Sequence, residues 1–250
     1  MSPMSSKSDI ADWDRIAKDF AETAKDGPRF DYIIDVFDQL LGDVSGLEVL
    51  DLGCGHGWLS GRLQEAGAAV TGVDGSTELL RLAKDQFENV TFTQADLAEG
   101  LPGFDRKKFD VVISHTVLMD IPDIKPLLRD VSGALSTDGR FIFSLLHPCF
   151  WNQKSQIDPE TGEWHKRVKG YLREEVLRVE SFGGHNHYHR PVSYYTQALQ
   201  ESGMLIQSLL EPQHQPTKSH SEIPEDFITR FSLFLLIEAV KSETGSAPTN

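Results

Sequence analysis

Three glycines alternate with other residues in the segment VLDLGCGHGWL, directly after an apolar run. They are Gly53, Gly55 and Gly57, with Asp51 before the first glycine and Cys54 after it. Glycine is conformationally costly, so its concentration at the end of a strand indicates that a ligand approaches the backbone closely. A dinucleotide site would require G-x-G-x-x-G at the start of the next helix, whereas the spacing here is G-x-G-x-G.

Polar residues follow the next three predicted strands at positions suited to a nucleoside. Asp74 ends AVTGVD, and its carboxylate can accept hydrogen bonds from both hydroxyls of a ribose. Asp96 ends VTFTQAD, where it can accept from the exocyclic amine of adenine, and Leu97 offers its backbone N–H to a ring nitrogen. His115 ends FDVVISH. Because ligands of open parallel sheets bind at the carboxyl ends of strands, the sequence predicts one cleft built from four strand ends.

Possible general bases cluster after the fifth predicted strand. His147 ends that strand, Pro148 stiffens the exit, and Phe150 and Trp151 could wall an apolar substrate. Imidazole titrates near neutral pH, so His147 is a candidate base for a hydroxyl acceptor. The alternative is a histidine that satisfies backbone groups at the turn.

More histidines lie in the segment GGHNHYHRP. Alternate spacing puts His185, His187 and His189 on one face if the segment is extended. Such a face could hold zinc, but no Cys or acidic ligand lies nearby, and a lid strand is preferred. His189 is a second candidate base and Tyr188 a candidate substrate contact. Arg190 could pair with a substrate carboxylate or with one of the acids of the chain.

Neither a disulfide framework nor a metal site is indicated. The chain has two cysteines, Cys54 and Cys149, without metal-ligand spacing. Asp120 and Asp123 in LMDIPD invite comparison with metal-dependent enzymes, but their spacing fits a helix start at Pro122 better. We therefore predict no metal.

The elements that carry these residues alternate between strands and helices. Predicted strands are LEVLDLG, AVTGVD, VTFTQAD, FDVVISH and RFIFSLL; predicted helices are LSGRLQEAG, STELLRLAKDQF and KPLLRDVSGALS, the last ending at Asp138-Gly139. A helix SYYTQALQESG and the strands MLIQSLLEP and FITRFSLFLLIEAV follow later. The alternation predicts an α/β fold with a doubly wound, Rossmann-like, mostly parallel seven-stranded sheet and an antiparallel edge.

Composition restricts the class of partner. The 250 residues carry 24 basic and 38 acidic side chains, a net charge of −14, which disfavours nucleic acid. The N-terminal segment lacks the apolar core of a signal peptide. The longest apolar run, FSLFLLIEAV, is too short to span a bilayer and contains Glu238. We expect a cytoplasmic protein that acts on a small molecule, without a nucleic-acid or membrane partner.

The segments VLDLGCGHG, VTGVDGS, FDVVISHTVLMDIPD and LSTDGRFIFSLL, with the segment around Asp96, resemble class I S-adenosylmethionine-dependent methyltransferases. Within them they resemble the small-molecule group related to ubiquinone- and natural-product-modifying enzymes. The resemblance covers roughly residues 45–147, and HRPVSYYTQALQESGMLI resembles the closing segment of that group. It implies S-adenosylmethionine as cofactor and in-line methyl transfer to a small, apolar or aromatic acceptor.

The resemblance also implies roles for the cleft residues. Gly53, Cys54 and Gly55 would contact the methionyl end, Asp51 would hold the loop or reach the amino group, Asp74 would bind the ribose, Asp96 and Leu97 the adenine, and His115 would lie beside the sulfonium half. Gly75 departs from the pattern, because bulkier apolar residues that pack on adenine are common at its position. The sequence therefore does not identify the residue that forms this wall of the adenine pocket.

The predicted organisation follows from these assignments. Residues 1–8 and 242–250 are tails, 9–45 are N-terminal helices broken at Gly27-Pro28 that cap the cofactor cleft, 46–147 and 191–241 are the core, and 148–190 are an aromatic-rich insertion that covers the substrate. Trp13, Phe20 and Phe30 of the N-terminal helices pack either on the sheet edge or over the cofactor. The sequence does not decide the oligomeric state, and a monomer and a homodimer are the alternatives.

Several functions stay open at this point. Oxygen is the preferred acceptor atom because histidine bases are plentiful, and N- or C-methylation by the same fold is the alternative. A non-catalytic cofactor-binding protein would bind without turnover. A nicotinamide oxidoreductase would use the same cleft, although the glycine spacing and Asp96 disfavour it. Nucleic-acid and protein-arginine methyltransferases are disfavoured because an NPPY-like tetrapeptide and a paired-glutamate hairpin are missing after the fourth strand.

Overall fold

The computed structural model describes residues 9–24, 32–104, 107–180, 183–213 and 230–242. The predicted tails, apart from Ser242, lie outside these residues, as do the predicted break at Gly27-Pro28 and Phe30.

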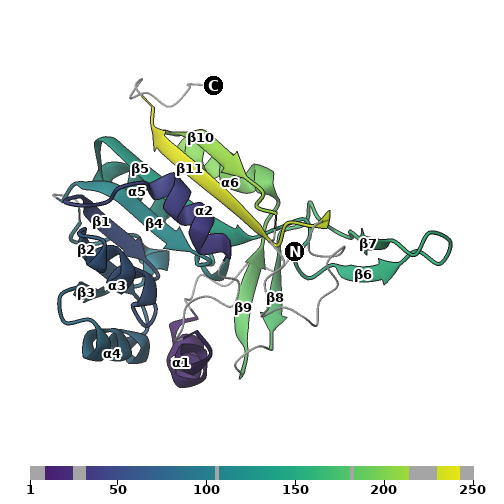
Figure 1. Ribbon diagram of the computed structural model, residues 1–250, viewed down its shortest axis with the longest axis horizontal. Coiled ribbons are helices and arrows are strands. Elements are labelled where there is room, and N and C mark those ends of the chain that lie inside the picture. Colours follow the sequence, from purple (N-terminus) through teal and green to yellow (C-terminus); the bar gives the residue numbers. More distant parts are fainter. Residues whose placement is uncertain (1–8, 25–31, 105–106, 181–182, 214–229, 243–250) are drawn as a thin grey trace.

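A seven-stranded sheet forms the centre of the fold, with the strand order β10-β11-β5-β4-β1-β2-β3 (Figure 1). Its strands are β1 (Glu48–Leu52), β2 (Ala69–Asp74), β3 (Thr91–Gln94), β4 (Phe109–His115), β5 (Leu135–Leu146), β10 (Met204–Leu210) and β11 (Phe234–Lys241). Strands β1 to β5 pair in parallel, and β11 runs antiparallel to both β5 and β10. The predicted Rossmann-like sheet with an antiparallel edge is confirmed. Its strand order reverses between β1 and β4, where such sheets open a crevice.

Helices cover both faces of this sheet. They are α1 (Ile10–Ala24), α2 (Tyr32–Leu41), α3 (Trp58–Glu65), α4 (Thr77–Gln86), α5 (Lys125–Ala134) and α6 (Val192–Glu201), with short 3-10 helices η1 (Leu97–Glu99) and η2 (Leu118–Asp120). Helix α4 is capped by Ser76, whose Oγ accepts from the amide of Leu79 at 3.1 Å. Within the part of the chain that the structure describes, no helix is both long and apolar enough to cross a membrane.

Neighbouring residues of one strand pack on opposite faces, because side chains alternate along a strand. Leu50 joins the cluster that holds α5 and α6, while Val49 joins the cluster that holds α2, α3 and α4. Near-continuous apolar strands are typical of parallel sheets covered on both faces. The two clusters, one on each face of the sheet, hold in place the strand ends that form the crevice.

The predicted end of the helix before β5 is wrong. The sequence predicts a helix up to Asp138-Gly139, but α5 ends at Ala134 and β5 begins at Leu135. The pairing of β5 with β4 is irregular between Leu135 and Arg140. A Cβ on Gly139 would lie 2.8 Å from the carbonyl oxygen of Phe109, so this glycine serves close strand pairing and not a helix stop.

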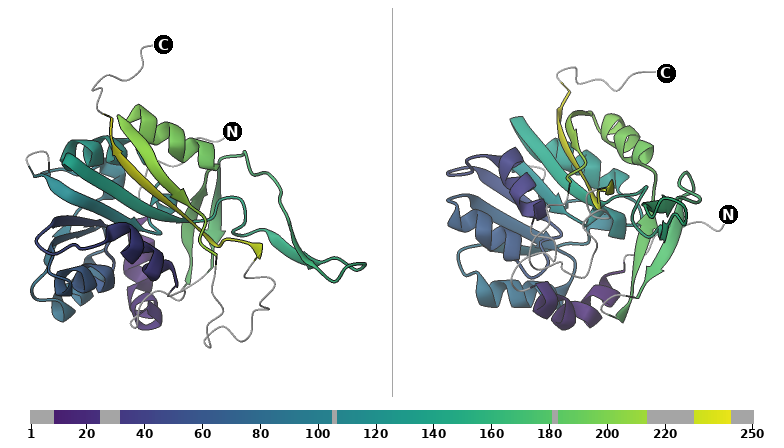
Figure 2. Two further views of the ribbon diagram at one scale, coloured as in Figure 1. Left: turned by 45° about the horizontal axis from the view of Figure 1, so that its top comes forward. Right: turned by 45° about the vertical axis from the view of Figure 1, so that its right-hand side comes forward.

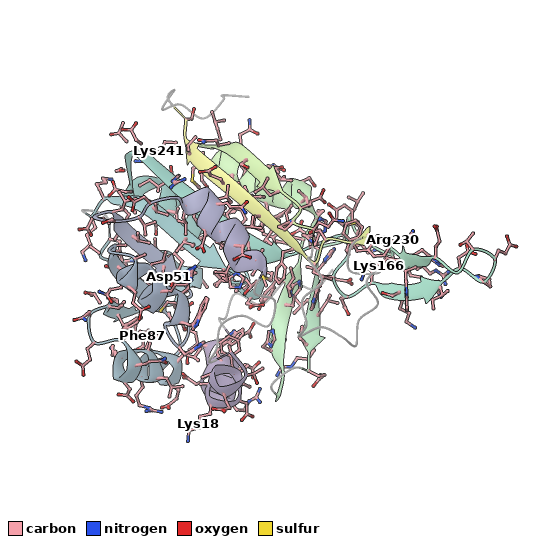
Figure 3. All side chains as sticks on the ribbon, viewed as in Figure 1. Lys18, Asp51, Phe87, Lys166, Arg230 and Lys241 are labelled. Atoms are coloured by element: carbon pink, nitrogen blue, oxygen red, sulfur yellow. The ribbon has the colours of Figure 1, made fainter. Side chains whose placement is uncertain are left out.

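The insertion after β5 forms two antiparallel hairpins, β6 (Lys154–Ile157) with β7 (Trp164–Arg167) and β8 (Glu175–Val179) with β9 (His185–His189). The first projects from the body (Figure 1 and the left view of Figure 2), with Lys166 and Arg230 near its base (Figure 3). The second lies beside α1: Arg15 donates to the carbonyls of Gly183 and Gly184, each at 2.8 Å. Among the described residues, the β8–β9 hairpin is thus a part of the insertion that meets the N-terminal helix.

Candidate functional site

The carboxyl ends of β1 to β4 open onto one cleft, which the beginning of α1 completes. Seven of the nine predicted cofactor residues line it: Gly53, Gly55, Asp74, Gly75, Asp96, Leu97 and His115. The other two, Asp51 and Cys54, lie behind it. The predicted convergence of four strand ends on a single cavity is therefore what the structure shows.

The glycine loop follows β1 and rests on the end of β2. Gly53 and Gly55 adopt left-handed backbone conformations, with φ of 68° and 56°. A Cβ on Gly53 would lie 2.5 Å from Cγ1 of Val117, so a side chain does not fit there. The amide of Gly53 donates to the carbonyl of Val73 at 2.7 Å, and that of Gly55 donates to Oδ2 of Asp74 at 2.9 Å. The end of β2 therefore holds the loop, through the carbonyl of Val73 and the carboxylate of Asp74.

Asp51 and Cys54 support the loop from inside the protein. Asp51 is 2% exposed, lies within the sheet (Figure 3), and accepts a hydrogen bond from Oγ of Ser60 at 2.6 Å. Burial raises the pKa of its carboxyl to about 7, against the effect of the Ser60 hydroxyl. Burial also raises the pKa of the Cys54 thiol well above its usual value, so it stays protonated and serves as a small filler.

Asp74 and Asp96 are oriented by backbone amides. Oδ1 of Asp74 accepts from the amide of Ser76 at 2.8 Å, in addition to the bond from Gly55 to Oδ2. Burial raises the pKa of Asp74, and these amides oppose the shift. Oδ1 of Asp96 accepts from the amide of Ala98 at 3.0 Å and so caps η1. A carboxylate offers about four acceptor sites, so both side chains keep acceptor capacity for a ligand.

His115 ends β4 as a neutral group. Its Nδ1 lies 2.7 Å from Oγ of Ser144 on β5, and its ring packs edge-on against Phe37 with centroids 5.5 Å apart. Burial lowers its pKa to about 4. The next residue, Thr116, has a φ of 55°, a left-handed conformation that costs energy in a non-glycine residue and is typical of functional sites.

The N-terminal helix supplies the wall of the predicted adenine pocket beside Gly75, which the sequence did not identify. A Cβ on Gly75 would lie 2.7 Å from both Cγ1 and Cδ1 of Ile10, so Ile10 fills the space that a larger residue at position 75 would occupy. Trp13 and Phe20 also line the cleft, with ring centroids 5.6 Å apart. These residues are so far from Gly75 along the chain that the sequence gives no indication of the contact.

Comparison with known families identifies the ligand for which this cleft is built. A family model described as a methyltransferase domain matches residues 43–200, well over half of the chain. The chain belongs to this methyltransferase family.

Solved structures and characterised relatives agree with this assignment. An S-adenosylmethionine-dependent methyltransferase from Mesorhizobium loti is 29% identical with a TM-score of 0.70, over 86% of this chain and 98% of the other. A Listeria monocytogenes protein assigned to the same class is 32% identical, also with a TM-score of 0.70, over 84% and 96%. The ubiquinone biosynthesis O-methyltransferase of Coxiella burnetii is 26% identical over 189 residues, 73% of this chain and 74% of the relative. That of Actinobacillus pleuropneumoniae is 32% identical over 126 residues, so the match spans about half of that relative, 52%.

The protein is thus an S-adenosylmethionine-dependent methyltransferase, and its cleft fits this cofactor. S-adenosylmethionine presents a sulfonium, an ammonium, two ribose hydroxyls and an adenine amine, which call for acceptors or negative charge. It also presents a carboxylate, which calls for donors such as backbone N–H groups. The charged side chains that line the cleft are the carboxylates of Asp9, Asp74, Asp96 and Asp120, and the described lining includes no Lys or Arg.

The methyltransferase keeps His147 outside the lining of this cleft. Its Nε2 lies 2.7 Å from Oε1 of Glu211, its Nδ1 accepts from the amide of Cys149 at 3.1 Å, and its ring stacks on Phe150 at 4.5 Å. Burial lowers its pKa, with Glu211 acting in the opposite direction. Both ring nitrogens are therefore engaged, as in the alternative in which this histidine satisfies groups at the turn.

Tyr188 and Arg190 do not line the cleft of the methyltransferase, but each of them hydrogen-bonds to residues that do or to their neighbours. The Tyr188 hydroxyl donates to Oδ2 of Asp9 at 2.7 Å. Arg190 is 1% exposed, and its guanidinium donates to three backbone carbonyls, those of Leu118, Ile121 and Pro122. Arg190 thus fixes the segment that follows β4, and its charge also acts on Asp120, an acid of this segment.

His189 and Trp151 lie at a second, polar hollow between the two hairpins. Nε2 of His189 lies 3.0 Å from the carbonyl oxygen of Tyr171, and Trp151 stacks on His187 at 4.1 Å. The structure therefore does not bring these two predicted residues to the cofactor cleft. Among the described residues, no three His, Cys, Asp or Glu side chains are grouped to hold a metal ion.

Asp120 is a cleft residue that the sequence presented only as a metal candidate. It ends η2 and lines the cleft, and its Oδ1 is buried without a hydrogen-bond partner among the described residues. Burial raises its pKa well above the usual value, Asp9 acts in the same direction, and Arg190 opposes them.

Proposed function

We propose that this methyltransferase transfers a methyl group to an oxygen atom of a small, apolar or aromatic molecule. The observation that carries the proposal is a single cleft in which the polar strand ends face the apolar side chains of Trp13, Phe20 and Ile121. The names of the ubiquinone biosynthesis O-methyltransferases among its relatives support oxygen as the acceptor atom.

We assign the cofactor contacts from the lining of the cleft. The backbone of Gly53 and Gly55 contacts the methionyl part, and Asp74 binds the ribose hydroxyls. Asp96 and the amide of Leu97 bind the adenine, whose ring packs on Ile10 above Gly75. Asp51 and Cys54 act from behind the loop, and neutral His115 lies beside the sulfonium.

When bound, S-adenosylmethionine supplies an electrophilic methyl group, and the residues of the chain orient the two reactants. Methyl transfer is an in-line displacement, so holding the acceptor oxygen against the methyl carbon is a large part of the catalysis. Trp13 and Phe20 give this cleft an apolar wall. A hydroxyl acceptor also needs a group that takes its proton. The two histidines predicted for this role do not line the cleft, so the group is to be sought among the residues that do.

The first test is calorimetric titration with S-adenosylhomocysteine, with NADH as a parallel ligand. We expect a Kd of about micromolar magnitude for the first ligand and no heat from the second. A folded protein that does not bind S-adenosylhomocysteine would contradict the proposal. Binding of NADH would favour the oxidoreductase alternative.

The second test measures how the charge of the acceptor affects the rate of methylation. It uses three catechols that carry the same pair of hydroxyl groups. They are 4-methylcatechol, which is neutral, dopamine, which is cationic, and 3,4-dihydroxybenzoate, which is anionic. Because the charged lining is acidic, we expect the anionic catechol to be methylated at least about tenfold more slowly than the other two. A preference for the anionic catechol would contradict the assigned lining.

A further inference from the structure

The four carboxylates that line the cleft differ in their partners. Asp9 accepts from two side chains, Asp74 from two backbone amides and Asp96 from one. Oδ1 of Asp120 is buried and has no partner among the described residues. Buried polar atoms are almost always hydrogen-bonded, so an orphaned carboxylate oxygen in a binding cleft indicates a ligand.

The segment that carries Asp120 is held rigidly. Arg190 donates to the carbonyl of Leu118 at 3.1 Å, and to those of Ile121 and Pro122 at 2.6 and 2.7 Å. These carbonyls flank Asp120 on both sides along the chain. The Nη atoms of the guanidinium therefore fix the backbone on both sides of Asp120, and neither they nor the unpartnered Nε of Arg190 hydrogen-bonds to Oδ1 of Asp120.

The surroundings of Asp120 favour a hydrogen-bond donor or a cation as that partner. Burial and Asp9 disfavour its charged form, and a positive group placed beside it would restore that form. The sulfonium of the cofactor is such a group. A buried carboxyl with a raised pKa is a stronger base than an exposed one, so in its charged form it can take a proton from a bound hydroxyl.

We propose that Asp120 binds the acceptor hydroxyl and takes its proton during methyl transfer. This inference rests on the proposed O-methylation. The hydroxyl oxygen forms a bond to the methyl carbon while the carbon–sulfur bond breaks, and that bond's electron pair stays on sulfur. The hydroxyl proton moves to Oδ1 of Asp120, which later releases it to solvent. The acceptor is therefore a neutral or cationic molecule with a hydroxyl group.

Sinefungin tests this placement without a known acceptor. It carries an amine where S-adenosylmethionine carries the transferred methyl, so the amine points to the position assigned to the acceptor. We expect the wild type to bind sinefungin about tenfold or more tightly than S-adenosylhomocysteine, because the amine gains a charge-assisted bond to Asp120. In Asp120→Asn the two affinities should become nearly equal, with that for S-adenosylhomocysteine changed by less than about threefold.

Asp123→Asn is the matched control, because Asp123 lies on the same segment, is exposed, and caps the amide of Lys125 at 3.0 Å. It should keep the wild-type affinity ratio. Asp120→Asn is isosteric and removes a carboxyl whose charged form burial already disfavours, so its thermal midpoint should not fall; Asp120→Ala provides a second variant.

Each other outcome has a definite meaning. An affinity ratio unchanged in Asp120→Asn, or close to one in the wild type, would overturn the inference. Equal weakening of both ligands would also overturn it, because Asp120 would then only position the cofactor. Failure of the folded wild type to bind either ligand would refute the proposed function itself.

Discussion

Substitution of Gly53 by alanine tests whether the glycine loop requires the close approach that the structure shows. A left-handed φ of 68° costs an alanine about 1–2 kcal/mol. Its Cβ would also lie 2.5 Å from Cγ1 of Val117, and such overpacking typically costs about 1–3 kcal/mol. We therefore expect Gly53→Ala to lower the free energy of unfolding by about 2–5 kcal/mol.

Gly46→Ala separates the two contributions. Gly46 has a φ of 76°, but a Cβ there would meet no atom within 4 Å. It should cost only the backbone part, so Gly53→Ala should be worse by about 1–3 kcal/mol. In a Val117→Ala background most of that difference should disappear.

Urea unfolding measures these differences as shifts of the midpoint at constant slope. Equal costs for Gly53→Ala and Gly46→Ala would refute the steric argument, because Val117 would then move aside freely.

Three further predictions concern residues around the cofactor. Ile10→Ala should weaken S-adenosylhomocysteine binding about three- to tenfold in calorimetry, because it removes about three buried methyl or methylene groups from the wall; unchanged affinity would contradict the adenine assignment. Folded Asp51 has a pKa of about 7, above its unfolded value, so the wild type loses stability as pH rises between about 4 and 7. Urea unfolding should show Asp51→Asn gaining up to about 3 kcal/mol relative to the wild type between pH 5 and pH 8, and no gain would refute the assignment. The pKa of His115 is lowered to about 4, so its NMR signals should not titrate between pH 6 and pH 8, and a midpoint in that range would contradict its burial.

The sequence predicts the sheet and most of the cofactor site because both depend on local patterns. Alternating strands and helices restrict the topology to a few right-handed arrangements, and the carboxyl ends of parallel strands must meet. Gly53, Asp74 and Asp96 each end or follow a strand, so their convergence needs no information on side-chain packing.

Other features depend on contacts between distant residues. Ile10 fills the space above Gly75, and Glu211 engages His147, across sequence separations that no local pattern encodes. The sequence shows that Asp120 follows the fourth strand, but it does not show that the side chain is buried. That burial results from the packing of β9 and Arg190 on its segment. The helix before β5 ends early because strand pairing competes with helix propensity at its last turn.

The attachment of α1 has a consequence for the way in which ligands enter and leave. This helix buries only Ile16 and Ala17, whereas α5 buries four residues. Besides a part-buried hydrogen bond from Ser76 to Asp14, its other ties include exposed polar contacts, such as those of Asp12 with Arg178 and of Arg15 with the carbonyl of Gly183. Such contacts contribute little free energy in water. The helix can therefore detach at a fraction of the cost of unfolding, while a ligand that touches both Ile10 and the strand ends fastens it down, so occupancy and local order rise together.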